Sequence, residues 1–325
     1  MQRSRTALRA LVRQLSTSAA PAAASTSTYT PPLKSGVLPV FDEAVAYIAR
    51  DRETKLEQLE QLKQQGADQA QLEKLEVEAW SNDPETRWRA KNGRGDLSKP
   101  VYRHLAQRAW RKEGDLAILM QRVTQMNVTP DLLAAISPQA DVRFRVGGEA
   151  VEPGSFTKPA QTRAGVEISA QVFHEEERLY TLLLIDPDVP DQMNQSFTTF
   201  AHLLLPNIPL SATSSSTLPL SDLPATLSYV PPHPQNGTPY HRYTALLLEQ
   251  PSSLNLEATQ REGFSAREFV QKHGLKPAGV TFFRQVWDQD VSKIYQEVLN
   301  LPEPRFGRAP KPDFYAGRPA KYEVV

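Results

Sequence analysis

The sequence contains no cysteine among its 325 residues. Disulfide bonds, zinc sites built on thiolates and cysteine nucleophiles are therefore excluded. No run of apolar residues approaches the roughly 20 that a membrane-spanning helix needs, so no membrane span is predicted. The chain also lacks a Gly-x-Ser-x-Gly nucleophile elbow, a Walker or dinucleotide-binding fingerprint and a His-x-x-x-His pair. We accordingly expect no catalytic residue, no metal site and no cofactor.

The chain also lacks net charge, but its charges are segregated along the sequence. Residues 42–86 hold five basic and twelve acidic residues, whereas residues 87–112 hold nine basic residues and one acidic residue. Residues 131–300 are acidic again, with 12 basic and 19 acidic residues. Any contact with an anionic polymer is therefore expected chiefly from the segments outside 131–300.

Residues 1–28 have the composition of a mitochondrial transit peptide, with four arginines, no acidic residue and then a run rich in serine, threonine and alanine. Apolar residues fall on one helical face and arginines on another: Leu8, Leu11, Val12 and Leu15 against Arg5, Arg9 and Arg13. We expect cleavage near Ser16. The alternative is a basic N-terminus that is never cleaved.

Residues 29–130 are predicted to form a helical and basic N-terminal extension. Apolar residues recur at helical spacing from Phe41 to Trp80, and Gly66 is expected to divide this stretch into two helices. The leucine stripe is narrow, which predicts helices that lie on something else and have no core of their own. Asn82-Asp83-Pro84 begins a new element, and a further helix is expected to end near Asn127.

Residues 87–112 combine basic side chains with aromatic ones. Basic side chains neutralise phosphates and aromatic rings stack on unpaired bases, so this segment is the predicted RNA-binding site. The candidate RNA contacts are Arg87, Trp88, Arg89, Lys91, Arg94, Arg103, Arg108, Trp110 and Arg111. The alternative is a solvated basic surface whose tryptophans dock onto the domain that follows.

Residues 131–300 are predicted to form a domain that is mostly β. Apolar runs indicate strands at 142–146, 166–173, 179–185, 200–205, 242–249 and 280–287. Helices are expected at 265–273 and 288–299, and a proline-rich loop at 206–236. Residues 301–325 form a proline-rich basic tail.

Three of these strands meet polar residues: Asp186 and Asp188 follow the first, His202 lies within the second, and His241 and Tyr243 open the third. If the strands are neighbours, these residues converge on one pocket. Asp-Pro-Asp-Val-Pro at 186–190 and Gly-Thr-Pro-Tyr-His-Arg-Tyr at 237–243 resemble the two signature segments of the phosphatidylethanolamine-binding protein family. Residues 264–299 resemble the closing helix, strand and helix of that family, so the resemblance covers roughly 131 to 300.

The resemblance implies a mainly β fold with flanking helices, here preceded by an extended α-helical arm. It also implies an anion pocket at Asp186, His202, His241 and Tyr243, with Asp188 beside it, where protonated imidazoles and a phenol would donate to phosphate oxygens. The pocket is interpreted as vestigial, because Thr199-Phe200 stands in place of the family's Glu-Trp pair and Pro234-Gln235 in place of its Pro-Pro pair. The alternative is that these aspartates cap loop amides and the histidines are satisfied core residues.

The leader and the charged arm narrow the resemblance to the proteins of this family in the large subunit of the mitochondrial ribosome. That resemblance implies a structural constituent, located in the mitochondrial matrix, that supports mitochondrial translation. Its implied partners are the mitochondrial large-subunit ribosomal RNA and neighbouring mitochondrial ribosomal proteins, bound through the extensions. The alternative function is a mitochondrial protein that binds an anion or phospholipid headgroup, or an inhibitor. A hydrolytic enzyme would depend only on the histidines and aspartates of the pocket.

Overall fold

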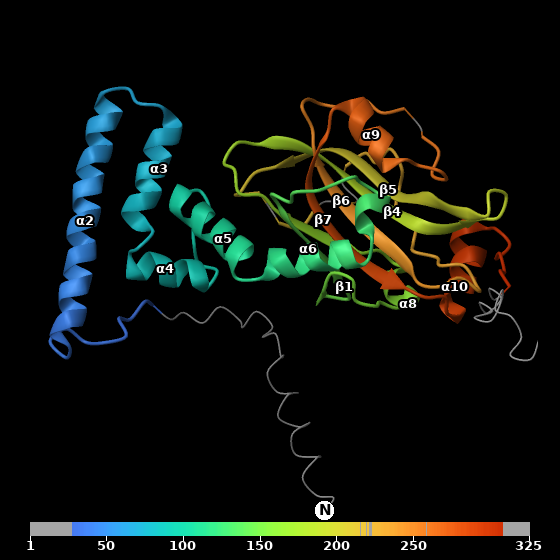
Figure 1. Cartoon of the computed structure of the whole chain (residues 1–325), viewed down its shortest axis with the longest axis horizontal. Helices are drawn as coiled ribbons and strands as arrows, with labels where there is room; N and C mark the ends of the chain where they lie inside the picture. The colour runs from blue at the N-terminus through green and yellow to red at the C-terminus, as the bar shows by residue number, and fades with distance from the viewer. Residues whose placement is uncertain (1–27, 215, 219, 221–222, 258, 308–325) are drawn as a thin grey trace, which may run out of the picture.

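A computed structural model describes residues 28–214, 216–218, 220, 223–257 and 259–307. In this part of the chain, a series of helices leads into a β domain and extends away from it as an arm (Figure 1). The fold is mainly β with flanking helices and is preceded by an extended α-helical arm, which confirms the predicted class. Residues 1–27 of the predicted transit peptide and the tail beyond residue 307 lie outside the described residues.

The arm contains α2 (Pro39–Gln64), α3 (Gln69–Trp80), α4 (Pro84–Lys91), α5 (Pro100–Lys112), α6 (Asp115–Gln125) and the single turn α7 (Val128–Asp131). Gly66 separates α2 from α3, as predicted, and its φ of +70° is a conformation that glycine adopts without strain. Asp83 caps α4, because its side chain accepts a hydrogen bond from the Thr86 amide at 2.9 Å. Among the helices in the described part of the chain, none is long and apolar enough to cross a membrane.

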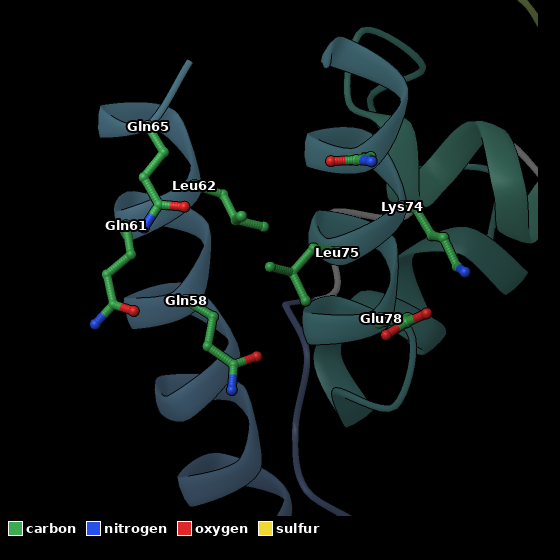
Figure 2. A pocket seen from close by; sticks show the side chains of 8 residues that line it. Gln58, Gln61, Leu62, Gln65, Lys74, Leu75 and Glu78 are labelled. Carbon is green, nitrogen blue, oxygen red and sulfur yellow. The ribbon is translucent and has the colours of Figure 1, made fainter. Parts of the chain in front are cut away.

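The α2–α3 hairpin is held by a narrow apolar contact. Both helices are described in full, and α2 buries only Leu59 while α3 buries only Ala79. Figure 2 shows Leu62 and Leu75 pointing toward each other across the interface. A groove of about 440 Å³ lies at this contact, and half of its lining residues are glutamines. The hairpin thus has no core of its own, as its narrow leucine stripe predicts.

Helices α5 and α6 attach the arm to the β domain. The buried residues of α5 are Val101, Tyr102, Arg103 and Trp110. The rings of Trp110 and Phe173 lie 5.7 Å apart between centroids, and Phe173 follows β3 in the domain. On α6, Leu119 and Val123 are buried in an apolar cluster of the domain. The arm is therefore packed on the domain through these two helices.

The β domain contains two antiparallel sheets. The first has the order β2-β1-β3 and the second β5-β4-β6-β7. The strands are β1 (Asp141–Val146), β2 (Glu149–Val151), β3 (Glu167–Gln171), β4 (Arg178–Asp191), β5 (Ser196–Leu210), β6 (His241–Glu249) and β7 (Lys276–Gln285). The flanking helices are α8 (Pro159–Thr162), α9 (Ala266–His273), α10 (Gln289–Ile294) and the π-helical turn η2 (Tyr295–Leu299). All six predicted strands and both predicted helical regions are present.

Three details differ from the sequence prediction. Strand β2 was not predicted, because three residues are too few to show a period. Strand β4 continues beyond residue 185, through the prolines of its polar end, and its register shifts between Asp186 and Val189. Strand β5 continues to Leu210, and Ile208 and Leu210 are buried, so the predicted loop begins five residues later than expected.

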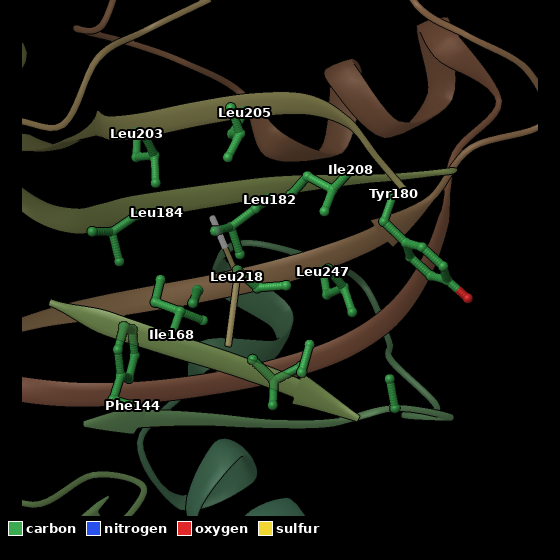
Figure 3. Close-up of a cluster of buried hydrophobic side chains, with 14 of the residues drawn as sticks. Phe144, Ile168, Tyr180, Leu182, Leu184, Leu203, Leu205, Ile208, Leu218 and Leu247 are labelled. Atoms are coloured by element: carbon green, nitrogen blue, oxygen red, sulfur yellow. The ribbon is translucent and has the colours of Figure 1, made fainter. Parts of the chain in front are cut away.

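The second sheet is buried on both faces. On one face, Leu182, Leu184 and Leu203 pack with Phe144 and Ile168 of the first sheet (Figure 3). On the other face, residues such as Leu183, Leu204 and Leu246 share a cluster with Leu119 of α6 and Phe269 of α9. Burial on both faces explains why these strands read as continuous apolar runs and do not alternate. The buried apolar runs also fix the positions of the polar residues at the ends of these strands.

Candidate functional site

The polar residues of β4 and β6, the two central strands of the second sheet, do meet at one end of their pairing. The Nδ1 of His241 lies 2.7 Å from Oδ2 of Asp186, and the Asp188 amide donates to Oδ1 of Asp186 at 2.8 Å. Asp186 is 2% exposed and His241 is 0% exposed. Burial alone would raise the pKa of the Asp186 carboxyl, but the attraction and hydrogen bond from His241 outweigh it, so this pKa is lowered.

His202 of β5 lies in the same cluster but is not a cation. Its ring lies 5.1 Å from that of Tyr243 between centroids, and its Nδ1 is 2.9 Å from the Val230 carbonyl oxygen. Burial, reinforced by the neighbouring His233, lowers the pKa of His202 to about 3. The ring is therefore neutral at pH 7. This corrects the expectation that both imidazoles would be protonated donors to a phosphate.

Asp188 does not belong to the cluster. Its carboxylate binds Arg242, with Oδ1 at 2.7 Å from Nη2 and Oδ2 at 2.9 Å from Nε. Arg242 also binds Asp131 of α7 at 2.8 Å. The register shift after Asp186 removes the regular alternation that would place Asp188 beside it. Asp188 therefore links β4 to β6. The prediction that it lies in the anion pocket is wrong.

The cluster includes residues that sequence reasoning missed. Thr238 Oγ1 lies 2.8 Å from Nε2 of His241 and donates to the Gln235 carbonyl oxygen at 2.8 Å. His233 is buried, with its ring 5.2 Å from that of His202 and 5.4 Å from that of Tyr295. The signal for His233 was its position in the Pro-Pro-His-Pro run just before the second signature segment.

The cluster is largely satisfied by the chain itself. Both nitrogens of His241 have partners, whereas Nε2 of His202 and the Tyr243 hydroxyl are buried without a hydrogen bond among the described residues. Burial raises the pKa of Tyr243 well above its ordinary value, and the Asp186 charge raises it further. Tyr243 thus stays neutral. The arrangement offers two neutral polar groups, which is a weaker anion site than a pair of imidazolium cations.

The described end of the tail lies against the loop that carries Thr238. The Phe306 amide donates to the Asn236 carbonyl oxygen at 2.8 Å, and Glu303 accepts from Trp287 Nε1 at 2.5 Å and from Ser292 Oγ at 2.8 Å. Gly237 has a φ of +90°, and a Cβ added there would lie 1.9 Å from the Phe306 carbonyl oxygen. Glycine is therefore required for this contact.

The predicted RNA contacts lie on α4, on α5 and in the loop between them. Arg87, Lys91, Arg108 and Arg111 are exposed. Arg89 is also exposed, but it is paired with Glu85 at 2.5 Å. The Trp88 ring is half-buried and the guanidinium of Arg94 lies over it, 5.5 Å from its centroid. Lys112, which the sequence analysis did not single out, is exposed as well.

Two predicted RNA contacts are wrong for this surface. Arg103 is 5% exposed and binds Glu175 at 2.9 Å and the Ser98 carbonyl oxygen at 2.7 Å. Trp110 is 6% exposed and packs on Phe173. Both side chains hold the arm on the domain, which agrees with the alternative interpretation for this tryptophan.

Comparison with known proteins defines the class first. The family model described as Phosphatidylethanolamine-binding protein matches residues 143–284, which span β1 to β7. The chain is also 30% identical over 242 residues to the Large ribosomal subunit protein mL38 of Schizosaccharomyces pombe, a match that covers 72% of this chain and 78% of that protein. The chain therefore belongs to the phosphatidylethanolamine-binding protein family.

The solved structures that resemble this chain are more distant in sequence. A carboxypeptidase Y inhibitor, complexed with its cognate proteinase, is 18% identical and has a TM-score of 0.46, covering 52% of this chain and 95% of the inhibitor chain. A phosphatidylethanolamine-binding protein from Plasmodium vivax is 17% identical with a TM-score of 0.40, covering 52% of this chain and 97% of that chain.

Proposed function

We propose that this chain is a structural constituent of the large subunit of the mitochondrial ribosome. The observation that carries the proposal is the similarity to a large ribosomal subunit protein over 72% of this chain and 78% of that protein. This match is longer than the family-model region at 143–284, so it includes sequence outside the β domain. The composition of residues 1–28 supports a mitochondrial location, in the matrix.

In this role, the β domain acts as a rigid block and the extensions make the contacts. The segment 87–112 binds the large-subunit ribosomal RNA through its exposed cations, because the acidic β domain repels phosphate on average. The acidic α2–α3 hairpin and the tail contact neighbouring mitochondrial ribosomal proteins. Domain boundaries near 131 and 300 fit this division. The role needs no catalysis, and the similarity to a ribosomal protein supports a chain that is not an enzyme.

Sedimentation tests the proposal directly. A mitochondrial lysate is centrifuged through a sucrose gradient, and the chain is detected beside the large-subunit ribosomal RNA. We expect the chain to co-sediment with that RNA, and to leave the heavy fractions when ribonuclease degrades it. A chain that remained at the top of the gradient as a monomer would refute the ribosomal role.

A mitochondrial ligand-binding protein is the second candidate. The observation that favours it is the pair of buried groups without a hydrogen bond, His202 Nε2 and the Tyr243 hydroxyl. A phosphate or phospholipid headgroup would then bind beside Asp186. Isothermal titration with phosphorylethanolamine tests it: saturable binding that His202→Phe abolishes would support this candidate, and no measurable heat would oppose it.

A further inference from the structure

A groove between α4 and α5 gathers four cations. It has a volume of about 450 Å³, and its lining includes Arg87 and Lys91 from α4 and Arg108 and Lys112 from α5. Each pair is spaced i, i+4, so its two members lie on one face of their helix, separated by roughly 6 Å along the axis. The two charged faces are therefore turned toward the same space. The only acidic residue of this lining is Glu113.

These four cations have no partner in the described residues of the chain. No hydrogen bond or ion pair of their side chains occurs there, whereas neighbouring Arg89 and Arg103 are paired with Glu85 and Glu175. Like charges at i, i+4 repel each other, and convergence of two such pairs adds to the repulsion. An anion in the groove would turn this unfavourable arrangement into a favourable one.

The rest of the lining indicates which anion fits. Besides Leu105 and Glu113, it consists of Ala90, Ala106 and Ala109, whose small side chains let a polymer backbone approach the helices closely. No aromatic ring is among the lining residues, so bases have nothing to stack on inside the groove. Charge without a stacking platform suits contact with phosphates and not with bases.

We propose that this groove binds the phosphodiester backbone of one RNA segment, independently of its base sequence. The inference rests on the proposed ribosomal function and assigns the main RNA contact within 87–112 to four residues. Arg87 and Lys91 hold phosphates on one side of the groove, and Arg108 and Lys112 hold them on the other. An acidic protein segment is the competing occupant, and the experiment below separates the two.

The test compares two double variants of the full chain that change the charge equally. Lys91→Glu with Lys112→Glu removes one cation from each side of the groove. Lys74→Glu with Lys99→Glu, the control, changes two exposed lysines of the arm that do not line the groove. Fluorescence anisotropy measures binding to labelled poly(U) and poly(A) oligonucleotides, and to poly-glutamate, over a series of KCl concentrations. Circular dichroism checks that both variants are folded.

We expect the groove variant to bind both RNAs roughly tenfold more weakly or worse, and its slope of log K against log salt to become less negative by about 1.4, or 0.7 for each lost phosphate contact. The control should keep the wild-type slope. An equal loss of RNA affinity in both variants would overturn the proposed groove site, while RNA binding by the arm in general would still stand. Tighter binding of poly-glutamate than of RNA, or a strong preference for one base, would also overturn it. If the groove variant fails to fold, Lys91→Gln with Lys112→Gln gives the same comparison.

Failure of the groove can be distinguished from failure of the proposed function. In the gradient described above, the wild-type chain tests the function and the groove variant tests the groove. Co-sedimentation of both chains at equal levels would overturn the groove alone. Absence of the wild-type chain from the large subunit would overturn the ribosomal role itself.

Discussion

The charged residues in the signature segments of the β domain differ from the cations that line the groove of the helical arm. In the domain, Asp186 is matched by His241, and Asp188 by Arg242, both within the chain. In the arm, Arg87, Lys91, Arg108 and Lys112 have no such partner among the described residues. Charged residues in a motif that suggests ligand binding can thus serve to stabilise the fold. Surface cations outside any motif can remain free to bind a partner. The comparison directs the search for a partner to the arm.

The strongest test of this contrast reverses charges in the arm. Changing Arg87, Lys91, Arg108 and Arg111 to Glu should abolish entry into the large subunit, because phosphate attraction becomes repulsion. The melting temperature should barely change, since all four side chains are exposed. Gradient sedimentation and differential scanning calorimetry measure the two effects. As a control, reversing Arg145, Lys158, Lys272 and Lys276, which are exposed on the domain, should leave entry intact. Equal loss in both would show that only net charge matters.

The domain side of the contrast is tested at His241. His241→Ala should lower the free energy of unfolding by about 3–5 kcal/mol, because it leaves the Asp186 carboxylate buried without its partner. Urea denaturation measures this loss. A variant that is still folded under the assay conditions should enter the large subunit normally. Exclusion of that folded variant would show that the cluster contributes to assembly as well as to stability.

The joint between the two regions is tested at Trp110. Trp110→Ala should cost roughly 3–5 kcal/mol of local stability, because a large buried side chain is removed from its contact with Phe173. Limited proteolysis should then cut the arm faster while the β domain keeps its melting temperature. Trp88→Ala is the matched control, since that ring is only half-buried. Cooperative loss of the whole fold would mean that the arm and domain unfold as one unit.

Counted per pH unit, the smallest expected effect is a pH dependence in the domain. The pKa of His202 is about 3 in the folded chain, whereas its ordinary value is 6.5. Below pH 6.5, the unfolded chain therefore binds a proton at this residue that the folded chain does not bind. Stability should therefore be fully present above pH 6.5 and fall toward pH 3, by about 1.4 kcal/mol per pH unit from this residue. Urea midpoints of the wild type and His202→Gln measure the slope. An identical slope in His202→Gln would assign the effect to another group, such as buried His233.

Much of the fold could be predicted because its apolar pattern is strong. The leucine runs of β4, β5 and β6 and the glycine break after α2 all carry a clear local signal. The polar end of β4 could not be placed, because Pro187 and Pro190 usually end a strand in the middle of a sheet. Here the strand tolerates them where its register shifts. A shift of that kind depends on the neighbouring strand, which a linear pattern does not show.

The site divides in the same way. The signature segments correctly brought Asp186, His202, His241 and Tyr243 together, because each lies on a strand of one sheet. Their charge states could not be predicted, since burial decides them. In the arm, the number of cations was evident from the sequence, but which face of α5 is buried was not. Arg103 and Trp110 are seven residues apart, so they share a helical face, and that face is the buried one.

Helix α5 therefore performs two tasks at once. One face, with Arg103 and Trp110, is fixed to the domain, and Arg108 and Lys112 face the groove. A helix of 13 residues is roughly 20 Å long and stiff, and no flexible linker separates these two contacts. If RNA binds the groove as proposed, rotation of the β domain relative to the RNA is restricted. Because α5 carries both contacts, it would then help to fix the orientation in which the outward surface of the domain meets other partners.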